Sequence, residues 1–177
     1  MMRLRAACKG ALIAGLGSLL LGCVYFHRQA AFKVVQDYLD AEVQRDSGNQ
    51  RAHWDAQSTA LIAAAGSVIP ASPMQQWYMV SYSTSPARVS IVGKKAYVTV
   101  SAQFAAPYKP PKNVTFTMFI VAHQETNVQG ETEEIWQVDE IQTKRQLAEA
   151  VVGKGYGDLW VNQLKTQRAL LAPAFLP

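Results

Sequence analysis

The hydrophobic residues that follow residue 28 recur at helical spacing. From residue 29 to 47 they stand three or four apart and share one face of a predicted helix; they are Phe32, Val35, Leu39 and Val43. A second helix is predicted from about residue 51 to 65, because Gly66 and Pro70 then supply stop signals. Two consecutive helices are therefore expected to open the domain.

The pattern then changes to the two-residue period of β-strands. Residues 76–84 are rich in aromatic and hydroxyl side chains, and residues 88–92 and 96–104 are typical of two strands joined at Gly93. In the second arm of this hairpin, alternate residues form an apolar face that consists of Val98, Val100, Ala102 and Phe104. The alternation predicts a sheet with one face in the core and one polar face.

Two further strands are predicted after prolines at positions 107, 110 and 111 interrupt the chain. Residues 114–122 alternate as a largely buried strand, and residues 134–141 form the last strand. The polar stretch 124–133 between them is expected to be an exposed hairpin loop with Gly130 at its turn.

The tail returns to helical spacing. A short helical segment is predicted over residues 144–152, followed by a longer helix over 158–171. Trp160, Leu164 and Leu171 lie on one side of this helix, and we expect the stripe to pack on the domain itself. Helices, then a meander of antiparallel strands, then helices indicate an α+β domain.

The first 26 residues have a different character. Residues 1–10 carry three positive charges and no acid, and residues 11–22 are an apolar run broken only by small residues. This layout is typical of a secretory signal peptide. It predicts a signal peptide over residues 1–22, a tether over 23–31 and a single α+β domain over 32–177.

The apolar run ends in a string that resembles the lipobox of bacterial lipoproteins, namely Leu20, Leu21, Gly22 and Cys23. The resemblance implies cleavage before Cys23 and lipid modification of its sulfur, and each buried methylene would contribute about 0.8 kcal/mol to membrane binding. Val24 stands where an aspartate would resemble an inner-membrane retention signal, so the outer membrane, facing the periplasm, is favoured. The alternative is an uncleaved anchor over residues 11–26, which is short for a span of about 20 apolar residues.

Charge and cysteine content exclude several classes of function. The predicted signal contains three of the 17 basic residues, so 14 remain against 13 acidic ones. This near-neutral balance argues against a nucleic-acid partner. Cys8 would be removed with the signal and Cys23 acylated, which leaves no thiol for a disulfide, a metal site or catalysis. No spacing typical of a zinc site, a phosphate loop or a nucleophile elbow is present, and no cofactor or metal is expected.

The order of elements resembles that of the NTF2-like, or cystatin-like, cone fold, in which a helical hairpin precedes a curved antiparallel sheet. The likeness covers about residues 32–141 and includes the terminal strand, whose string is Ile135, Trp136, Gln137, Val138 and Asp139. In that superfamily the tryptophan of such a strand lines a cavity between sheet and helices. The helix expected beyond residue 144 departs from the pattern and would cap the mouth of the cone. A related fold occurs in a bilayer-anchored component of type IV secretion machines.

Few residues are candidates for catalysis. His53 and Asp55 stand two apart on a predicted helix and point to different faces, so they are interpreted as a solvated pair. The resemblance to cone-fold isomerases and dehydratases places His123 among cavity-lining residues, where Asp37 or Asp40 would complete a proton-abstracting pair. No spacing rule ties these residues together, so no catalytic residue is assigned and the protein is predicted not to be an enzyme.

Aromatic residues are the remaining candidates for a binding site. Most are expected in the core, but tyrosine and tryptophan also suit pockets and interfaces because they combine apolar area with a polar group. We assign Tyr38, Trp77 and Trp136, together with His123, as possible pocket residues.

Three functions follow from these observations. The first is a non-enzymatic envelope lipoprotein, anchored through Cys23, that binds a protein partner or a small apolar ligand. The second is a structural component of a secretion or conjugation machine, and the third is a cone-fold enzyme. The sequence identifies neither the partner nor the oligomeric state.

Overall fold

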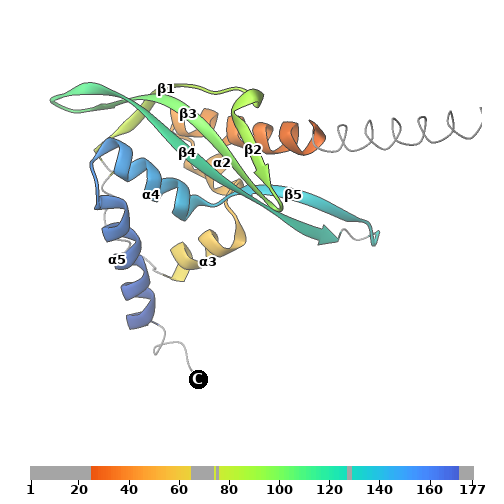
Figure 1. Cartoon of the computed structure of the whole chain (residues 1–177). Helices are drawn as coiled ribbons and strands as arrows, with labels where there is room; N and C mark the ends of the chain where they lie inside the picture. The colour runs from red at the N-terminus through yellow and green to blue at the C-terminus, as the bar shows by residue number, and fades with distance from the viewer. Residues whose placement is uncertain (1–24, 65–73, 75, 127–128, 172–177) are drawn as a thin grey trace, which may run out of the picture.

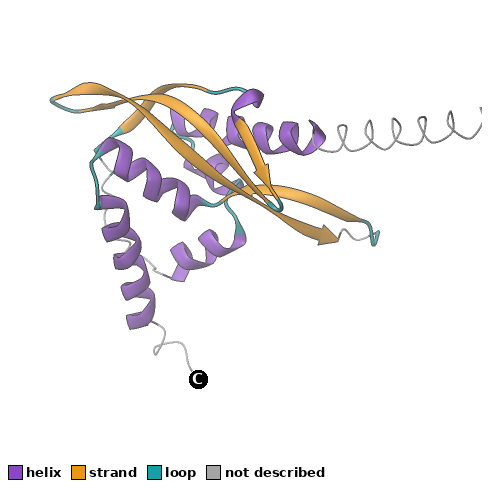
Figure 2. Cartoon of the chain, viewed as in Figure 1, coloured by secondary structure: helices purple, strands orange, loops and turns teal. Residues whose placement is uncertain are grey.

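The computed structural model describes residues 25–64, 74, 76–126 and 129–171. Helices pack on a curled antiparallel sheet of five strands, and further helices follow the sheet (Figures 1 and 2). The predicted α+β class, with N-terminal helices on a curved sheet and an extra C-terminal helix, is confirmed.

The N-terminal helix covers residues 25–44, and its apolar side packs in the core as predicted. Ala31, Val35 and Leu39 are fully buried there. Residues 25–31, which the sequence assigned to the tether, are part of this helix. Residues 25–31 therefore belong to the folded unit and not to a tether.

Two short helices follow, α2 over Ser47–Ala52 and α3 over Ala56–Ala64. The prediction of one helix over residues 51–65 is wrong. Between α2 and α3 the chain forms a parallel bridge from Trp54 to Val138. The backbone of Val138 exchanges two hydrogen bonds, of 2.7 and 2.8 Å, with the residues on either side of Trp54. Local spacing cannot reveal such a break because the partner strand lies far along the chain.

The sheet consists of β1 over Tyr78–Ser83, β2 over Val89–Val92, β3 over Lys95–Ala106, β4 over Lys109–Thr126 and β5 over Thr132–Val138. Its order is β1-β3-β4-β5, with β2 also paired to β3. Because β4 pairs along one edge of β3, β1 and β2 share the other edge. The short 3-10 helix Pro86–Arg88 separates β1 from β2.

The hairpin predicted around Gly93 is formed by β2 and β3, and Gly93 has the positive φ, 60°, that such a turn favours. The prolines do not all interrupt the sheet as predicted. Pro110 and Pro111 lie inside β4, where its register against β3 slips between Phe104 and Ala106. A bulge near the end of a strand tolerates residues that lack an amide proton.

The connection between β4 and β5 is shorter than predicted. β4 continues to Thr126 and β5 begins at Thr132, so part of the expected loop over residues 124–133 is strand. Gly130 lies in the connection with a positive φ of 83°, as its assignment to the turn requires.

The last strand also ends earlier than predicted. β5 ends at Val138, whereas the sequence pattern suggested a strand to residue 141. Asp139 instead caps helix α4, Glu140–Val151, because its carboxylate accepts a hydrogen bond of 3.0 Å from the N–H of Gln142. The apolar residue at position 141 belongs to a helix face rather than to the sheet.

Helix α5, Tyr156–Leu171, ends the described chain and packs on the domain as predicted. Trp160 and Leu164 are buried in a small apolar cluster with Ile141 of α4, and α3 contacts the same cluster. The side chain of Leu171, the third residue of the predicted stripe, lies outside the described residues.

The main core lies on one face of the sheet. Alternate residues of β3 and β4 form this face, and the most completely buried are Val98, Val100, Phe104, Met118 and Ile120. Side chains of the N-terminal helix and of α4 pack against them. These side chains occupy the space that the cone-fold resemblance assigned to a cavity.

Candidate functional site

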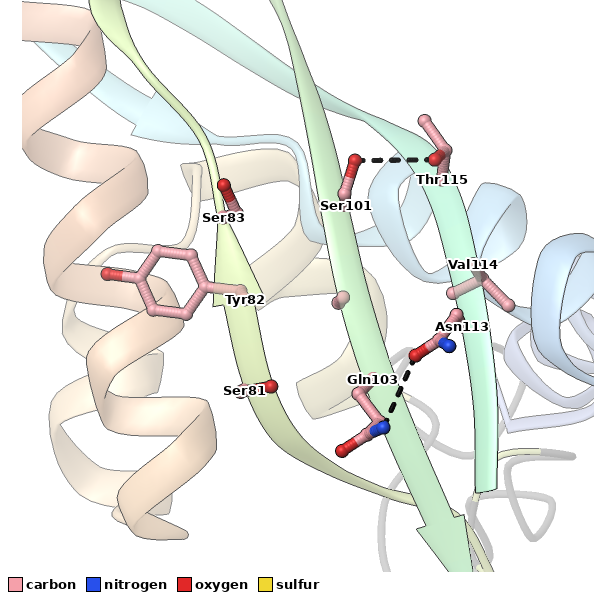
Figure 3. A pocket seen from close by; sticks show the side chains of 9 residues that line it. Ser81, Tyr82, Ser83, Ser101, Gln103, Asn113, Val114 and Thr115 are labelled. Atoms are coloured by element: carbon pink, nitrogen blue, oxygen red, sulfur yellow. Dashed lines mark hydrogen bonds between the residues drawn. The ribbon is translucent and has the colours of Figure 1, made fainter. Parts of the chain in front are cut away.

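The face of the sheet opposite the core carries two rows of small polar side chains that cross β1, β3 and β4 (Figure 3). The register of the strands places six residues in these rows: Ser83, Ser101 and Thr115 in the first, and Ser81, Gln103 and Asn113 in the second. They point outward because strand residues alternate between faces, and their neighbours along β3 are buried in the core.

The two rows line a shallow hollow of about 350 Å³. Within it, Ser101 Oγ lies 3.4 Å from Thr115 Oγ1, and Gln103 Nε2 donates to Asn113 Oδ1 at 3.3 Å. Arg88, from the 3-10 helix, donates a hydrogen bond to Ser101 Oγ at 3.1 Å. This bond places a positive charge beside the first row. In each row the side chains of β3 and β4 are thus linked by a hydrogen bond.

Tyr82 lies at the rim of this hollow, with its ring turned toward the N-terminal helix (Figure 3). Its hydroxyl donates to Asp40 Oδ1 at 2.7 Å. Burial, together with this hydrogen bond and the negative charge of Asp40, raises the pKa of Tyr82 to about 12. The phenol is therefore neutral at physiological pH and cannot act as a base there.

Hydroxyl and amide groups both donate and accept hydrogen bonds, so this face suits a partner with mixed polar groups. Further along the same face, the rings of Tyr97 and Phe119 meet edge to face with centroids 5.6 Å apart. Both rings are partly buried, and neutral polar groups beside partly accessible aromatic area are found at surfaces that bind proteins.

The predicted pocket residues do not gather at one place. Tyr38 and Trp136 are 3 % and 5 % exposed and belong to the core. His123 lies on the opposite face from Trp136, since Trp136 pairs with Ala122 and the next residue of β4 points the other way. Trp77 is half-buried just before β1.

The acid–base pair that an enzyme would need is not formed by the expected residues. His123 Nε2 lies 2.9 Å from Glu125 Oε1, and both side chains are accessible to solvent. Asp37 pairs with Lys33 one helical turn away, and Asp40 accepts from the hydroxyl of Tyr82. His123 therefore has a surface carboxylate as its neighbour rather than Asp37 or Asp40.

Trp77 borders a second, smaller hollow of about 220 Å³ between the β3–β4 turn and the end of α4. The ammonium groups of Lys109 and Lys112 lie 5.5 and 5.0 Å from the centre of its ring. Lys112 also donates to the carbonyl of Val151 at 2.7 Å, where a cation complements the C-terminal end of a helix. Lys109 and Lys112 therefore have structural contacts at this hollow, with the Trp77 ring and, for Lys112, with the end of α4.

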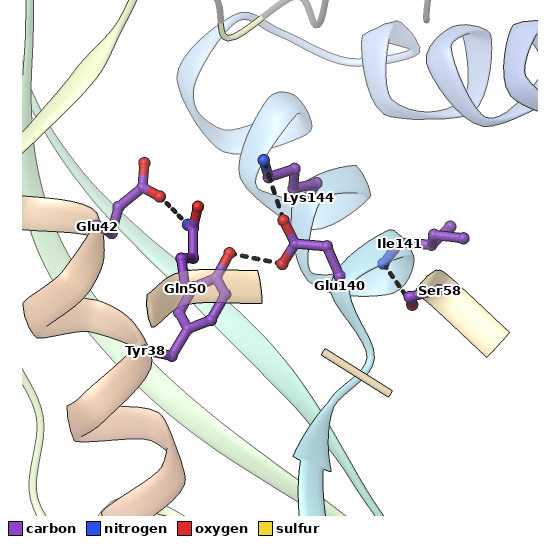
Figure 4. A network of polar contacts seen from close by, with 7 residues as sticks. All are labelled: Tyr38, Glu42, Gln50, Ser58, Glu140, Ile141 and Lys144. Atoms are coloured by element: carbon purple, nitrogen blue, oxygen red, sulfur yellow. Dashed lines mark hydrogen bonds and ion pairs between the residues drawn. The ribbon is translucent and has the colours of Figure 1, made fainter. Parts of the chain in front are cut away.

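A cluster of polar side chains is buried where the N-terminal helix, α2 and α4 meet (Figure 4). Glu140 is fully buried; it accepts from the Tyr38 hydroxyl at 2.6 Å, and its other oxygen lies 3.0 Å from Lys144 Nζ. Gln50 donates to Glu42 beside this pair. The Lys144 side chain keeps 28 % exposure, so solvent reaches one side of the cluster. The arrangement joins three helices through charge and hydrogen bonds.

The environment of this cluster changes the acidity of its members. Burial and the Glu140 carboxylate raise the pKa of Tyr38 well above its ordinary value. Burial raises the pKa of Glu140, although Lys144 and Tyr38 oppose this. For Lys144, burial is the largest influence and lowers the pKa, but the charges of Glu140 and Glu42 and the hydrogen bond to Glu140 together outweigh it, so the pKa is raised. Sequence reasoning missed Glu140 by assigning it to a strand; Asp139 followed by Gln142 is the capping signal that identifies the helix start.

Cys23 and the predicted signal peptide lie outside the described residues. Within the described ranges, no helix is long and apolar enough to cross a membrane, and no three histidine, cysteine, aspartate or glutamate side chains are grouped to hold a metal ion. No protein-family model, curated protein or solved structure matches the chain.

Proposed function

We propose that this protein is a membrane-anchored envelope lipoprotein without enzymatic activity, and that it binds a protein partner through the open face of its sheet. The observation that carries the proposal is the pair of hydroxyl and amide rows across β1, β3 and β4. Their side chains are accessible and neutral, and they form a shallow hollow rather than a deep cleft. A broad, hydrogen-bonding surface of this kind suits another protein better than a small molecule.

A small apolar ligand between sheet and helices has less support. Such a ligand would need the space now filled by Phe104, Met118 and Ile120, each at most 1 % exposed. Displacing packed core side chains costs free energy that a small ligand would have to offset. The open face requires no such rearrangement.

The membrane anchor rests on the lipobox-like string that ends at Cys23. Acyl chains on this residue would hold the protein at the bilayer while the folded unit remains in the aqueous compartment. The anchored protein would then hold the open face of its sheet close to the membrane, where a partner protein can bind it.

Site-specific photo-crosslinking in cells tests the partner surface. A photoreactive amino acid at Ser101 or Thr115 is expected to yield a crosslinked protein, because both positions lie within the rows. The matched control is the same amino acid at Gln163, which is exposed on α5. Adducts from Gln163 but none from either row position would overturn the proposal.

A further inference from the structure

We propose that Tyr25 and Phe26 form a membrane-contact patch that lies on the bilayer surface and sets the orientation of the whole domain. The proposal rests on the proposed function only in requiring an anchor next to these residues. Tyr25 and Phe26 are 60 % and 74 % exposed, and their rings meet edge to face with centroids 6.4 Å apart. Two large exposed aromatic side chains next to each other on a helix need a reason, and the adjoining anchor supplies one.

The position of the patch along the chain identifies its partner as lipid. A single residue, Val24, separates Tyr25 from Cys23, so acyl chains on Cys23 bring both rings to the headgroup region. An uncleaved apolar anchor over residues 11–26 would end in the same two residues. Aromatic side chains are enriched at this depth because their rings tolerate a zone that is partly apolar and partly wet.

The patch is rigidly coupled to the domain. Tyr25 and Phe26 begin the described part of the N-terminal helix, and the next residue, His27, places Nδ1 2.8 Å from Glu134 Oε1 of β5. The His27 ring also packs edge to face against Trp136, with centroids 6.1 Å apart. One turn later Ala31 is fully buried. Contact of the patch with lipid therefore restricts the tilt of the whole sheet.

The direction of the helix shows which end of the sheet faces the membrane. At its beginning, the helix contacts β5 beside the β4–β5 connection. Just after its end, the Arg45 guanidinium stacks 4.3 Å from the ring of Tyr78, which pairs with Ala105 near the β3–β4 turn. The helix thus runs along the length of the sheet, and the β3–β4 turn lies at the opposite end from the helix start (Figure 1).

This orientation places the candidate binding face within reach of a partner. The 18 residues of β4 extend over at most about 60 Å at ~3.3 Å per residue. Both rows cross β3 and β4 in the halves of these strands near the distal turn. The patch therefore keeps the rows away from the lipid, while the fully exposed Tyr108 marks the distal tip.

Energy transfer to the bilayer tests the orientation. The anchored protein is reconstituted in phosphatidylcholine vesicles that carry a headgroup acceptor dye. A donor dye is attached through an azide-bearing amino acid that replaces Glu133, near the membrane end, or Tyr108, at the distal tip, so that no cysteine is labelled. We expect several-fold stronger transfer from position 133 than from 108, because transfer falls steeply with distance.

The double variant Tyr25→Ser/Phe26→Ser removes the patch and leaves both dye positions intact. It should reduce the difference between the two transfer efficiencies, because the anchor alone no longer fixes the tilt of the domain, while circular dichroism shows an unchanged fold. Leu159→Ser, which removes an exposed apolar residue of α5, is the matched control and should preserve the difference. Equal transfer from both positions in the parent protein, or a difference of unchanged size in the double variant, would overturn the proposal.

Labelling with a fatty-acid probe separates this proposal from the lipid anchor. If energy transfer shows the expected orientation but Cys23 takes up no fatty-acid probe, the membrane-contact patch is supported, and lipidation is rejected in favour of the apolar anchor. If Cys23 is labelled but the two dye positions show equal transfer, the lipid anchor is supported and the membrane-contact patch is rejected.

Discussion

The side chain of Trp136 stands beside Val138 on the core face of β5 and is 5 % exposed. Removing it would leave a cavity in contact with the N-terminal helix, because the His27 ring packs on its indole. We predict that Trp136→Ala lowers the free energy of unfolding by about 3–5 kcal/mol. Urea denaturation measures this change, with Tyr108→Ala at a fully exposed position as the control. A loss below about 1 kcal/mol, which is typical of surface substitutions, would contradict it.

The contribution of the buried Glu140–Lys144 pair to stability should depend on pH. Lys144→Met leaves the Glu140 carboxylate buried without its cation, and we expect a loss of about 2–3 kcal/mol at pH 7, below the value for a fully buried pair because solvent reaches Lys144. The pKa of Glu140 is already raised by burial and rises further in the variant. The folded variant then binds the proton more tightly than the unfolded chain, so the loss shrinks as the pH falls toward the ordinary value of 4.5.

Denaturant titrations of Lys144→Met and wild type at pH 7 and pH 5 measure the two differences. Lys165→Met, on an exposed position of α5, is the control and should change stability by less than about 0.5 kcal/mol at either pH. An equal loss at both pH values would show that Lys144 acts through packing of its alkyl chain rather than through its charge.

At the scale of elements, the crossing of α4 and α5 depends on Gly157. A Cβ atom at this position would lie 2.3 Å from the carbonyl oxygen of Arg145. The same turn is held by the Glu149 carboxylate, which accepts from the N–H groups of Gly155 and Gly157 at 2.7 and 2.8 Å. The two helices thus approach at a place where only glycine fits.

We predict that Gly157→Ala destabilises the protein by about 1–3 kcal/mol, as overpacking does. The direction is informative because glycine to alanine in a helix normally stabilises by up to about 1 kcal/mol. Gly48→Ala in α2 is the matched control, since the nearest atom to its Cβ is an aspartate oxygen at 3.4 Å. Thermal unfolding of both variants compares them, and a higher midpoint for Gly157→Ala would refute the close crossing.

At the scale of the whole molecule, the anchor decides where the folded unit acts. We predict that Cys23→Ser leaves an uncleaved precursor and abolishes incorporation of a fatty-acid probe, because the sulfur that accepts the lipid is lost. Immunoblotting and probe labelling of the variant in a bacterial host measure both effects. A variant that still matures and still labels would rule out lipidation at Cys23.

The amino-acid pattern by itself determined the class of the fold and most of its elements. Helical spacing from Phe32 to Val43, the alternation in β3 and the turn at Gly93 are local properties, and each element follows from residues close to it in the chain. The same alternation predicted that one side of the sheet is polar. Helical spacing likewise predicted that α5 packs on the domain.

Tertiary structure decided what depends on partners far apart in the chain. The bridge from Trp54 to Val138 divides one expected helix into two, and the cap at Asp139 ends β5 before residue 141. Strand register aligns the polar residues of three strands into rows, and no local pattern reveals that alignment. The helices also fill the cone and bury Tyr38 and Trp136, whereas His123 lies on the opposite face of β4. Register, helix crossings and cavity filling arise from packing between distant segments, so they become visible only once the chain is folded.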